Sequence, residues 1–200
     1  PIIVSCGMSD MDEIKTTISE INNKKAYPLI LMFTTSQYPV PDEDVNMLKL
    51  KTIRDEFSDI ILGYSDHTQG NIASTLAITL GAKVFEKHFT IDKNLPGPDH
   101  WFSALPDELE EWNKSIKRSW IMLGNNEVKP TINELKNKKS FRRKLVALKN
   151  IEKGDKFSED IVGMRRTKNE SLFLDIEKII GRLSSRRIDY GEIIDAGCIE

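Results

Sequence analysis

Residues 63–103 read GYSDHTQGNIASTLAITLGAKVFEKHFTIDKNLPGPDHWFS, and this stretch contains all three histidines of the chain. His67 follows one apolar run, and His88 follows a second. The segment between them, 72–80, is rich in alanine, leucine and isoleucine and is typical of a helix. The stretch therefore predicts strand, helix and strand, with a histidine at the carboxyl end of each strand. In α/β barrels the catalytic groups lie at those ends.

The two strand-end histidines are candidates for binding a divalent metal ion. Because side chains alternate along a strand, Ser65 lies on the same face as His67. Glu86 shares a face with His88 for the same reason. Two neutral imidazoles with nearby carboxylates can hold such an ion. The nearby carboxylates are Asp66, Glu86 and Asp99. A single strand-end histidine is more often structural, so the spacing alone leaves both interpretations open.

The composition is that of a globular protein without a strong charge. The 200 residues suit one or two domains, and 39% hydrophobic with 30% charged residues predict a packed core. The net charge of −2 provides no basic field for nucleic acid or an anionic membrane. The basic run KNKKSFRRK at 136–144 is typical of a solvated helix face or linker.

The sequence also bears on the compartment. Cys6 and Cys198 are too few and too far apart to indicate a disulfide framework, so we expect a cytoplasmic protein. No stretch approaches the length of a membrane span, and no signal peptide is visible. The chain begins with Pro1 directly before an apolar run, so we expect a piece of a longer protein.

Strands are predicted at regular intervals along the first part of the chain. They begin near Ile2, Leu29, Ile60 and Val84, which are 27, 31 and 24 residues apart. Helices are predicted between them, including one that runs from Asp42 through Ile53, and a further helix begins at Pro106. This alternation indicates parallel βαβ units. Because the strands are almost continuously apolar, we expect the sheet to be covered on both faces.

The character of the chain changes after Gly124. Residues 1–124 carry the βαβ pattern, and the polar, basic residues 125–142 predict a helical linker. Residues 143–200 contain only short apolar pieces, which predict a small, loop-rich domain with a core of marginal size.

Several motifs together resemble the sialic acid synthase family, whose members condense phosphoenolpyruvate with N-acetylmannosamine or a related hexosamine. The motifs within residues 63–103 are GYSDHT (63–68), GAKVFEKHFT (81–90) and PGPDHWFS (96–103). The others are IVSCGM (3–8), TTSQYPVP (34–41), RRKLVAL (142–148) and IEKGDKFSEDI (151–161). The resemblance covers essentially the whole chain, in the same order.

The resemblance implies an α/β fold in two parts. Residues 1–124 would be the C-terminal half of a TIM (β/α)8 barrel, strands five to eight. Residues 143–200 are similar to the family's SAF domain, a mostly β domain like the type III antifreeze proteins. Roughly the first half of the catalytic domain, with its phosphate-binding lysines, would then lie outside this sequence.

The resemblance also implies roles for individual residues. His67 and His88 match the two metal-binding histidines, which would hold Mn²⁺ or Mg²⁺ as a Lewis acid on the sugar aldehyde. Glu86 matches a carboxylate that we expect to transfer a proton or position water. Hydroxyls near the phosphate are expected from Ser5 and Ser65. The residues that match sugar contacts are Tyr38, Asp99 and Ser36. Many relatives carry asparagine at the position of Ser36.

Residues 143–200 supply one further expected site residue. Arg166 matches an arginine that the SAF domain of one subunit inserts into its partner's active site, which implies a domain-swapped homodimer. Arg165 is a close rival. Relatives usually continue with proline and a glycine-rich loop, but this chain continues with residues 167–171, TKNES, which puts the lid's shape and the identity of the sugar in question. His100 is either a loop-ordering residue or a substrate contact.

The function predicted from the resemblance is that of a transferase forming a carbon–carbon bond. It would join phosphoenolpyruvate to an N-acyl hexosamine, releasing phosphate and a nine-carbon 2-keto acid for surface glycans. The acceptor could be N-acetylmannosamine, its 6-phosphate, or a 6-deoxy diacetamido sugar. One alternative is a metal-dependent aldolase that uses pyruvate on the same barrel. The other is a non-catalytic glycan-binding or ice-binding module.

Overall fold

The structure is a computed structural model that describes residues 1–24, 28–167 and 174–200. The chain divides into two compact units, Pro1–Asn125 and Asn126–Glu200. Each unit has a hydrophobic core of its own.

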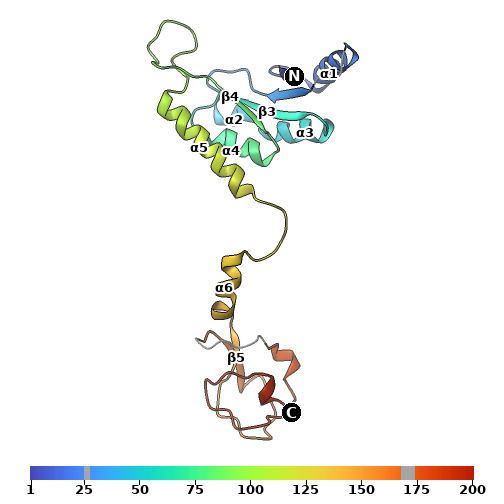
Figure 1. Cartoon of the computed structure of the whole chain (residues 1–200), viewed down its shortest axis with the longest axis vertical. Helices are drawn as coiled ribbons and strands as arrows, with labels where there is room; N and C mark the ends of the chain where they lie inside the picture. Colours follow the sequence, from blue (N-terminus) through green and yellow to red (C-terminus); the bar gives the residue numbers. More distant parts are fainter. Residues whose placement is uncertain (25–27, 168–173) are drawn as a thin grey trace. The chain divides into compact units, whose positions relative to one another are not determined.

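The first unit is a parallel α/β structure. Among its described residues, four strands lie side by side in chain order: β1 (Ile2–Ser5), β2 (Leu29–Phe33), β3 (Ile61–Asp66) and β4 (Val84–Lys87). The helices between and after them are α1 (Met11–Lys24), α2 (Asp42–Val45), α3 (Leu48–Glu56), α4 (Ile72–Thr79) and α5 (Pro106–Leu123) (Figure 1). The predicted alternation of strands and helices in parallel βαβ units is confirmed.

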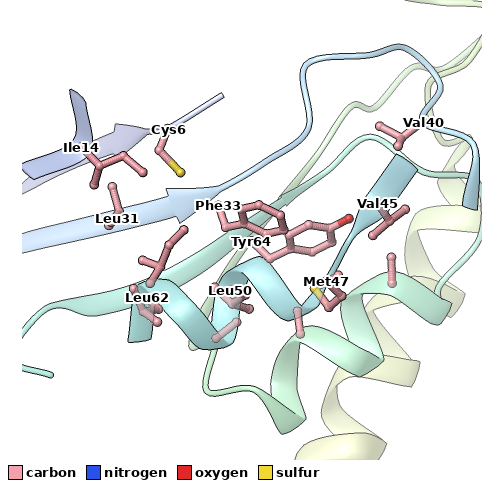
Figure 2. Packing of buried hydrophobic residues seen from close by; sticks show 14 of the residues in the cluster. Cys6, Ile14, Leu31, Phe33, Val40, Val45, Met47, Leu50, Leu62 and Tyr64 are labelled. Carbon is pink, nitrogen blue, oxygen red and sulfur yellow. The ribbon is translucent and has the colours of Figure 1, made fainter. Parts of the chain in front are cut away.

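The core of this unit lies between the sheet and its helices. On one face of the sheet Phe33 and Tyr64 stack with ring centroids 5.9 Å apart, beside Leu50 of α3 (Figure 2). The strand residues Leu31 and Leu62 belong to the same cluster. Burial of these apolar side chains is the main favourable contribution to the stability of the unit.

The other face of the sheet differs from the expectation. Ile3 is 59% exposed and Ile61 43% exposed, although both lie on strands. The described helices of this chain pack on the opposite face, so the prediction that both faces are covered is wrong for the described residues. On this inner face Met32 lies over Gly63, where an added Cβ would be 2.1 Å from the Met32 sulfur and 2.8 Å from the Val84 carbonyl oxygen.

One helix start and one helix end show how the local sequence sets the elements. Asp10 accepts a hydrogen bond from the Glu13 amide, and Glu13 accepts one from the Asp10 amide, which together cap α1. The helix predicted from Asp42 through Ile53 is instead two helices. Asn46 between them has a φ of 46°, a left-handed conformation that asparagine tolerates and that ends α2.

The second unit is built from short pieces. Its helix α6 (Ile132–Phe141) has a capping box from Thr131 and Glu134, and the antiparallel strands β5 (Lys144–Ala147) and β6 (Val162–Arg165) follow. The described part of this unit also contains the 3₁₀ turns η1 (Ile176–Lys178) and η2 (Ala196–Cys198). The small core includes the buried residues Leu145, Ile151, Phe157, Ile179 and Ile188.

The two cysteines are free thiols, one in each unit. Both are buried, and this burial raises the pKa of each thiol. Within the described parts of the chain, no helix is long and apolar enough to cross a membrane.

Candidate functional site

The site lies where β3 and β4 end. The register of these strands pairs Ser65 with Glu86, and the Ser65 hydroxyl donates a hydrogen bond to Glu86 Oε1 at 2.7 Å. Two residues further along each strand, the rings of His67 and His88 lie with centroids 5.2 Å apart and planes at 71°. The structure therefore brings together the four residues that alternation placed on one face.

His67 is held in one orientation by its backbone surroundings. Its Nδ1 lies 2.9 Å from the Thr35 carbonyl oxygen, and the Thr34 hydroxyl is 3.2 Å from the same nitrogen. A carbonyl oxygen only accepts, so Nδ1 carries the proton and Nε2 keeps its lone pair. Nε2 lies 3.4 Å from the Ser65 hydroxyl.

The protonation of His67 follows from its burial. The side chain is only 7% exposed, and burial lowers the pKa of the imidazole. The Thr35 carbonyl opposes this shift in pKa, whereas the neighbouring His88 adds to it. The ring is therefore neutral at pH 7, which is the form that binds a metal ion.

His88 lies at the more open side of the pair. Its Nδ1 is 3.9 Å from Asp99 Oδ2, beyond hydrogen-bonding distance, and both side chains are partly exposed. Asp99 lies in the loop after β4, where its carbonyl oxygen accepts from the Ser103 hydroxyl at 2.6 Å. The predicted sugar-contacting carboxylate thus lies next to the histidine pair.

An aromatic wall borders the two histidines. Tyr38 lies with its ring centroid 4.3 Å from His67 and 5.5 Å from His88. Phe102 completes the wall, 5.0 Å from His88 and 5.5 Å from Tyr38. Sequence reasoning missed Phe102, although its position three residues after Asp99 was an available signal.

Asp66 does not belong with the candidate ligands. Its side chain is on the opposite face, where Oδ2 accepts from the Ser74 hydroxyl at 2.6 Å and from the Trp112 indole at 3.1 Å. The expectation that Asp66 helps to hold a metal is wrong, because alternation along β3 points it away from His67. Among the residues that the structure describes, no three histidine, cysteine or acidic side chains converge as a metal site.

The remaining expected residues lie at different places. Ser5 ends β1, exposed and in register with Met32, on the face that carries Ser65. Ser36 lies beyond β2 and lines a cleft of about 620 Å³ together with Cys6 and Gln37. Within the described part of the chain, neither serine is hydrogen-bonded to His67 or His88.

His100 and the two candidate arginines lie outside the histidine pair. His100 Nδ1 lies 2.7 Å from the Thr90 hydroxyl, which fits its loop-ordering interpretation. Arg165 ends β6, and Arg166 follows it as an exposed residue of the second unit. The expected departure from the family at 167–171 falls mostly on residues outside the described part of the chain.

The chain is similar to known proteins over most of its length. The NeuB family matches residues 1–128. An N,N'-diacetyllegionaminic acid synthase of Legionella pneumophila is 37% identical over 195 residues, which are 96% of this chain and 54% of that protein. The chain spans about half the length of the curated relatives it matches.

Solved structures agree with this similarity. The spore coat polysaccharide biosynthesis protein SpsE of Bacillus subtilis is 29% identical, with a TM-score of 0.60, and the match covers 100% of this chain and 61% of that one. An N-acetylneuraminic acid synthetase of Leptospira borgpetersenii is 34% identical with a TM-score of 0.61, over 68% of this chain and 47% of that one. The curled parallel sheet is thus half of an α/β barrel, as predicted.

We expect His67 to be the Nδ1–H tautomer, with its pKa below the ordinary value of about 6.5. The Thr35 carbonyl fixes the tautomer, and burial disfavours the charged ring. Nitrogen-15 NMR of the metal-free protein across pH 5 to 8 measures both properties, and His67→Gln assigns the signal. A ring protonated on Nε2 alone, or one that gains its second proton above pH 7, would contradict this site geometry.

Proposed function

Because this chain belongs to the NeuB family, we propose that the whole protein is a phosphoenolpyruvate-dependent sugar acid synthase. It would join phosphoenolpyruvate to an N-acyl hexosamine and release phosphate and a nine-carbon 2-keto acid. The observation that carries the proposal is the facing pair His67 and His88, with Ser65 and Glu86 hydrogen-bonded beside them at the same strand ends.

The histidine pair fits the metal ion that the family implies. A hydrogen bond from the second ring nitrogen to a carbonyl is the usual support of a metal-ligating histidine, and His67 has it. Two protein ligands leave positions open for substrate and water, as catalytic sites require. Mn²⁺ and Mg²⁺ both favour oxygen ligands, so either ion would take its remaining ligands from substrate and water. When bound, the ion supplies Lewis-acid polarisation of the sugar aldehyde.

The other residues of the site serve the proton and water steps. As the enol carbon of phosphoenolpyruvate bonds to the aldehyde carbon, the aldehyde oxygen becomes a hydroxyl by taking up a proton. Water adds to the second carbon of the former phosphoenolpyruvate, and the carbon–oxygen bond to phosphate breaks. Glu86, held at Oε1 by the Ser65 hydroxyl, is placed to move a proton or to position that water.

Substrate contacts are proposed around this centre. The Ser5 hydroxyl suits a phosphate or carboxylate group, and the Ser65 hydroxyl would donate to such a group by exchanging its hydrogen bond to Glu86. Tyr38, Asp99 and Ser36 would contact the sugar, and the ring of Tyr38 together with Phe102 would keep water from the histidines. The similarity to a legionaminic acid synthase makes diacetamido hexosamines candidates for the acceptor beside N-acetylmannosamine.

The proposal predicts phosphate release that depends on both histidines. The protein in its whole encoded length, with Mn²⁺ and phosphoenolpyruvate, should release phosphate with one member of a panel of N-acyl hexosamines. Replacing His67 and His88 together by alanine should lower kcat/KM by about a thousandfold or more, because the Lewis acid supplies several kcal/mol.

His100→Ala is the matched control, since His100 bonds a loop threonine instead of lying in the pair. Its phosphate release should stay within a few-fold of the natural protein. Full turnover by the double variant would overturn the role of the pair. Turnover of pyruvate instead of phosphoenolpyruvate would indicate the aldolase, and no Mn²⁺ affinity with no turnover would indicate a binding module.

We also propose that residues 143–200 form a SAF-like domain whose Arg166 acts on the partner subunit's site in a domain-swapped, cytoplasmic homodimer. Support comes from the match of the whole chain, tail included, to the SpsE structure. The small β core of the second unit and the exposed position of Arg166 fit this role.

Mixing two inactive variants tests this arrangement. His67→Ala and Arg166→Ala proteins, unfolded and refolded together, should recover about a quarter of the natural activity, because half of the dimers then have one intact site. Each variant refolded alone is the control and should remain inactive. An Arg166→Ala protein that is fully active, or a mixture that recovers nothing, would contradict action across the dimer.

A further inference from the structure

A buried polar cluster lies directly behind the histidine pair, on the opposite face of the sheet. At its centre the side chain of Asp66 is 0% exposed, and Lys87, 8% exposed, approaches Oδ2 to 3.3 Å. Asp66 Oδ1 accepts from the amide and the hydroxyl of Thr68, at 2.9 and 2.7 Å. Ser74 and Trp112 donate to Oδ2 from α4 and α5.

Each member of the ion pair is adjacent in sequence to two residues of the site. Asp66 lies between Ser65 and His67 in the chain, and Lys87 lies between Glu86 and His88. The register of the two strands pairs Asp66 with Lys87 directly. Because alternate residues point to opposite faces, a shift of one strand end against the other would disturb both the ion pair and the histidine pair.

The cluster also fixes the turn that follows His67. Lys87 donates to the Thr68 carbonyl oxygen at 2.8 Å, and Asp66 holds the amide and hydroxyl of the same threonine. The chain on the far side of His67 is therefore attached to β4 as well as to its own strand. The backbone of His67 is thus held on both sides, independently of its side-chain hydrogen bonds.

Stability alone does not account for such a pair. Two charges lose their hydration when buried, and well-packed apolar residues in their place are often as stable or more stable. A buried ion pair is, however, favourable only in a good geometry with its remaining hydrogen-bonding groups satisfied, as Thr68, Ser74 and Trp112 satisfy Asp66 here. It is therefore suited to fixing how two strand ends align.

We propose that Asp66 and Lys87 are positioning residues, which align the ends of β3 and β4 so that His67 and His88 face a common point. The inference deepens the proposed function, on which it rests for the identity of the metal-binding pair. Neither residue touches substrate, since both side chains lie on the outer face of the sheet. We expect them to affect the affinity for the metal ion and kcat, and to have little effect on the affinity for phosphoenolpyruvate.

The test uses the protein in its whole encoded length. The double variant Asp66→Asn with Lys87→Met removes both charges at once, so no unpaired charge is left buried. Its Mn²⁺ affinity, measured by titration calorimetry without substrate, should fall about 10- to 100-fold, as for other residues that orient metal ligands. Under saturating Mn²⁺ kcat should still fall, with KM for phosphoenolpyruvate within about twofold.

A matched control removes an ion pair elsewhere in the same unit. Lys51 and Asp55 form an exposed pair on α3, 2.6 Å apart, and Lys51→Met with Asp55→Asn makes the same two chemical changes there. This control should leave Mn²⁺ affinity and kcat unchanged. Nitrogen-15 NMR of the metal-free proteins gives a readout without metal, because the ring signals of His67 and His88 should shift only in the first double variant.

The outcomes separate this inference from the proposed function. A folded Asp66→Asn, Lys87→Met protein with natural Mn²⁺ affinity, histidine signals and kcat would overturn the positioning role. Failure of the natural protein to release phosphate with any sugar would overturn the proposed function instead, and the NMR comparison would still decide the alignment. If the double variant does not fold, Lys87→Arg keeps the charge but displaces it, and unchanged Mn²⁺ affinity in that variant would overturn the inference.

Discussion

The register between β3 and β4 is the constraint on which the site depends. One pairing of the strands places Ser65 against Glu86 on the inner face and Asp66 against Lys87 on the outer face. The hydrogen bond on one side and the buried ion pair on the other both require that pairing. A slip of β4 by one residue would turn Glu86 to the outer face and Lys87 to the inner face. The pairing of these two strands therefore positions the residues of the proposed chemistry, and the loops add the aromatic wall and the carboxylate of Asp99.

The two faces of the sheet have different tasks. The outer face carries Leu31, Phe33, Leu62 and Tyr64, which belong to the hydrophobic cluster packed between the sheet and its helices (Figure 2). The inner face carries the polar site residues at its carboxyl end and exposed isoleucines, among them Ile3, nearer its start. In a half barrel the described helices can cover only one face, so the same apolar strand sequence is buried on one side and open on the other.

Much of this arrangement could be predicted from the sequence, because it follows from local rules. Apolar runs with turn signals gave the strands, and alternation placed His67 and His88 on one face. The same alternation turns Asp66 to the opposite face, so the sequence already indicated that Asp66 is not a ligand. The break at Asn46 depends on one left-handed residue within a helical pattern. The Thr35 carbonyl that fixes His67 is a backbone group brought from another strand end, which no side-chain pattern reveals.

We propose that His67 and His88 bind one metal ion through imidazole nitrogens. Pulsed electron paramagnetic resonance of the Mn²⁺-loaded whole protein measures this directly, because ligating nitrogen nuclei modulate the electron spin echo. We expect couplings from two imidazole nitrogens, one lost in His67→Ala and the other in His88→Ala. A Mn²⁺ signal without nitrogen coupling, or one that neither substitution changes, would contradict it.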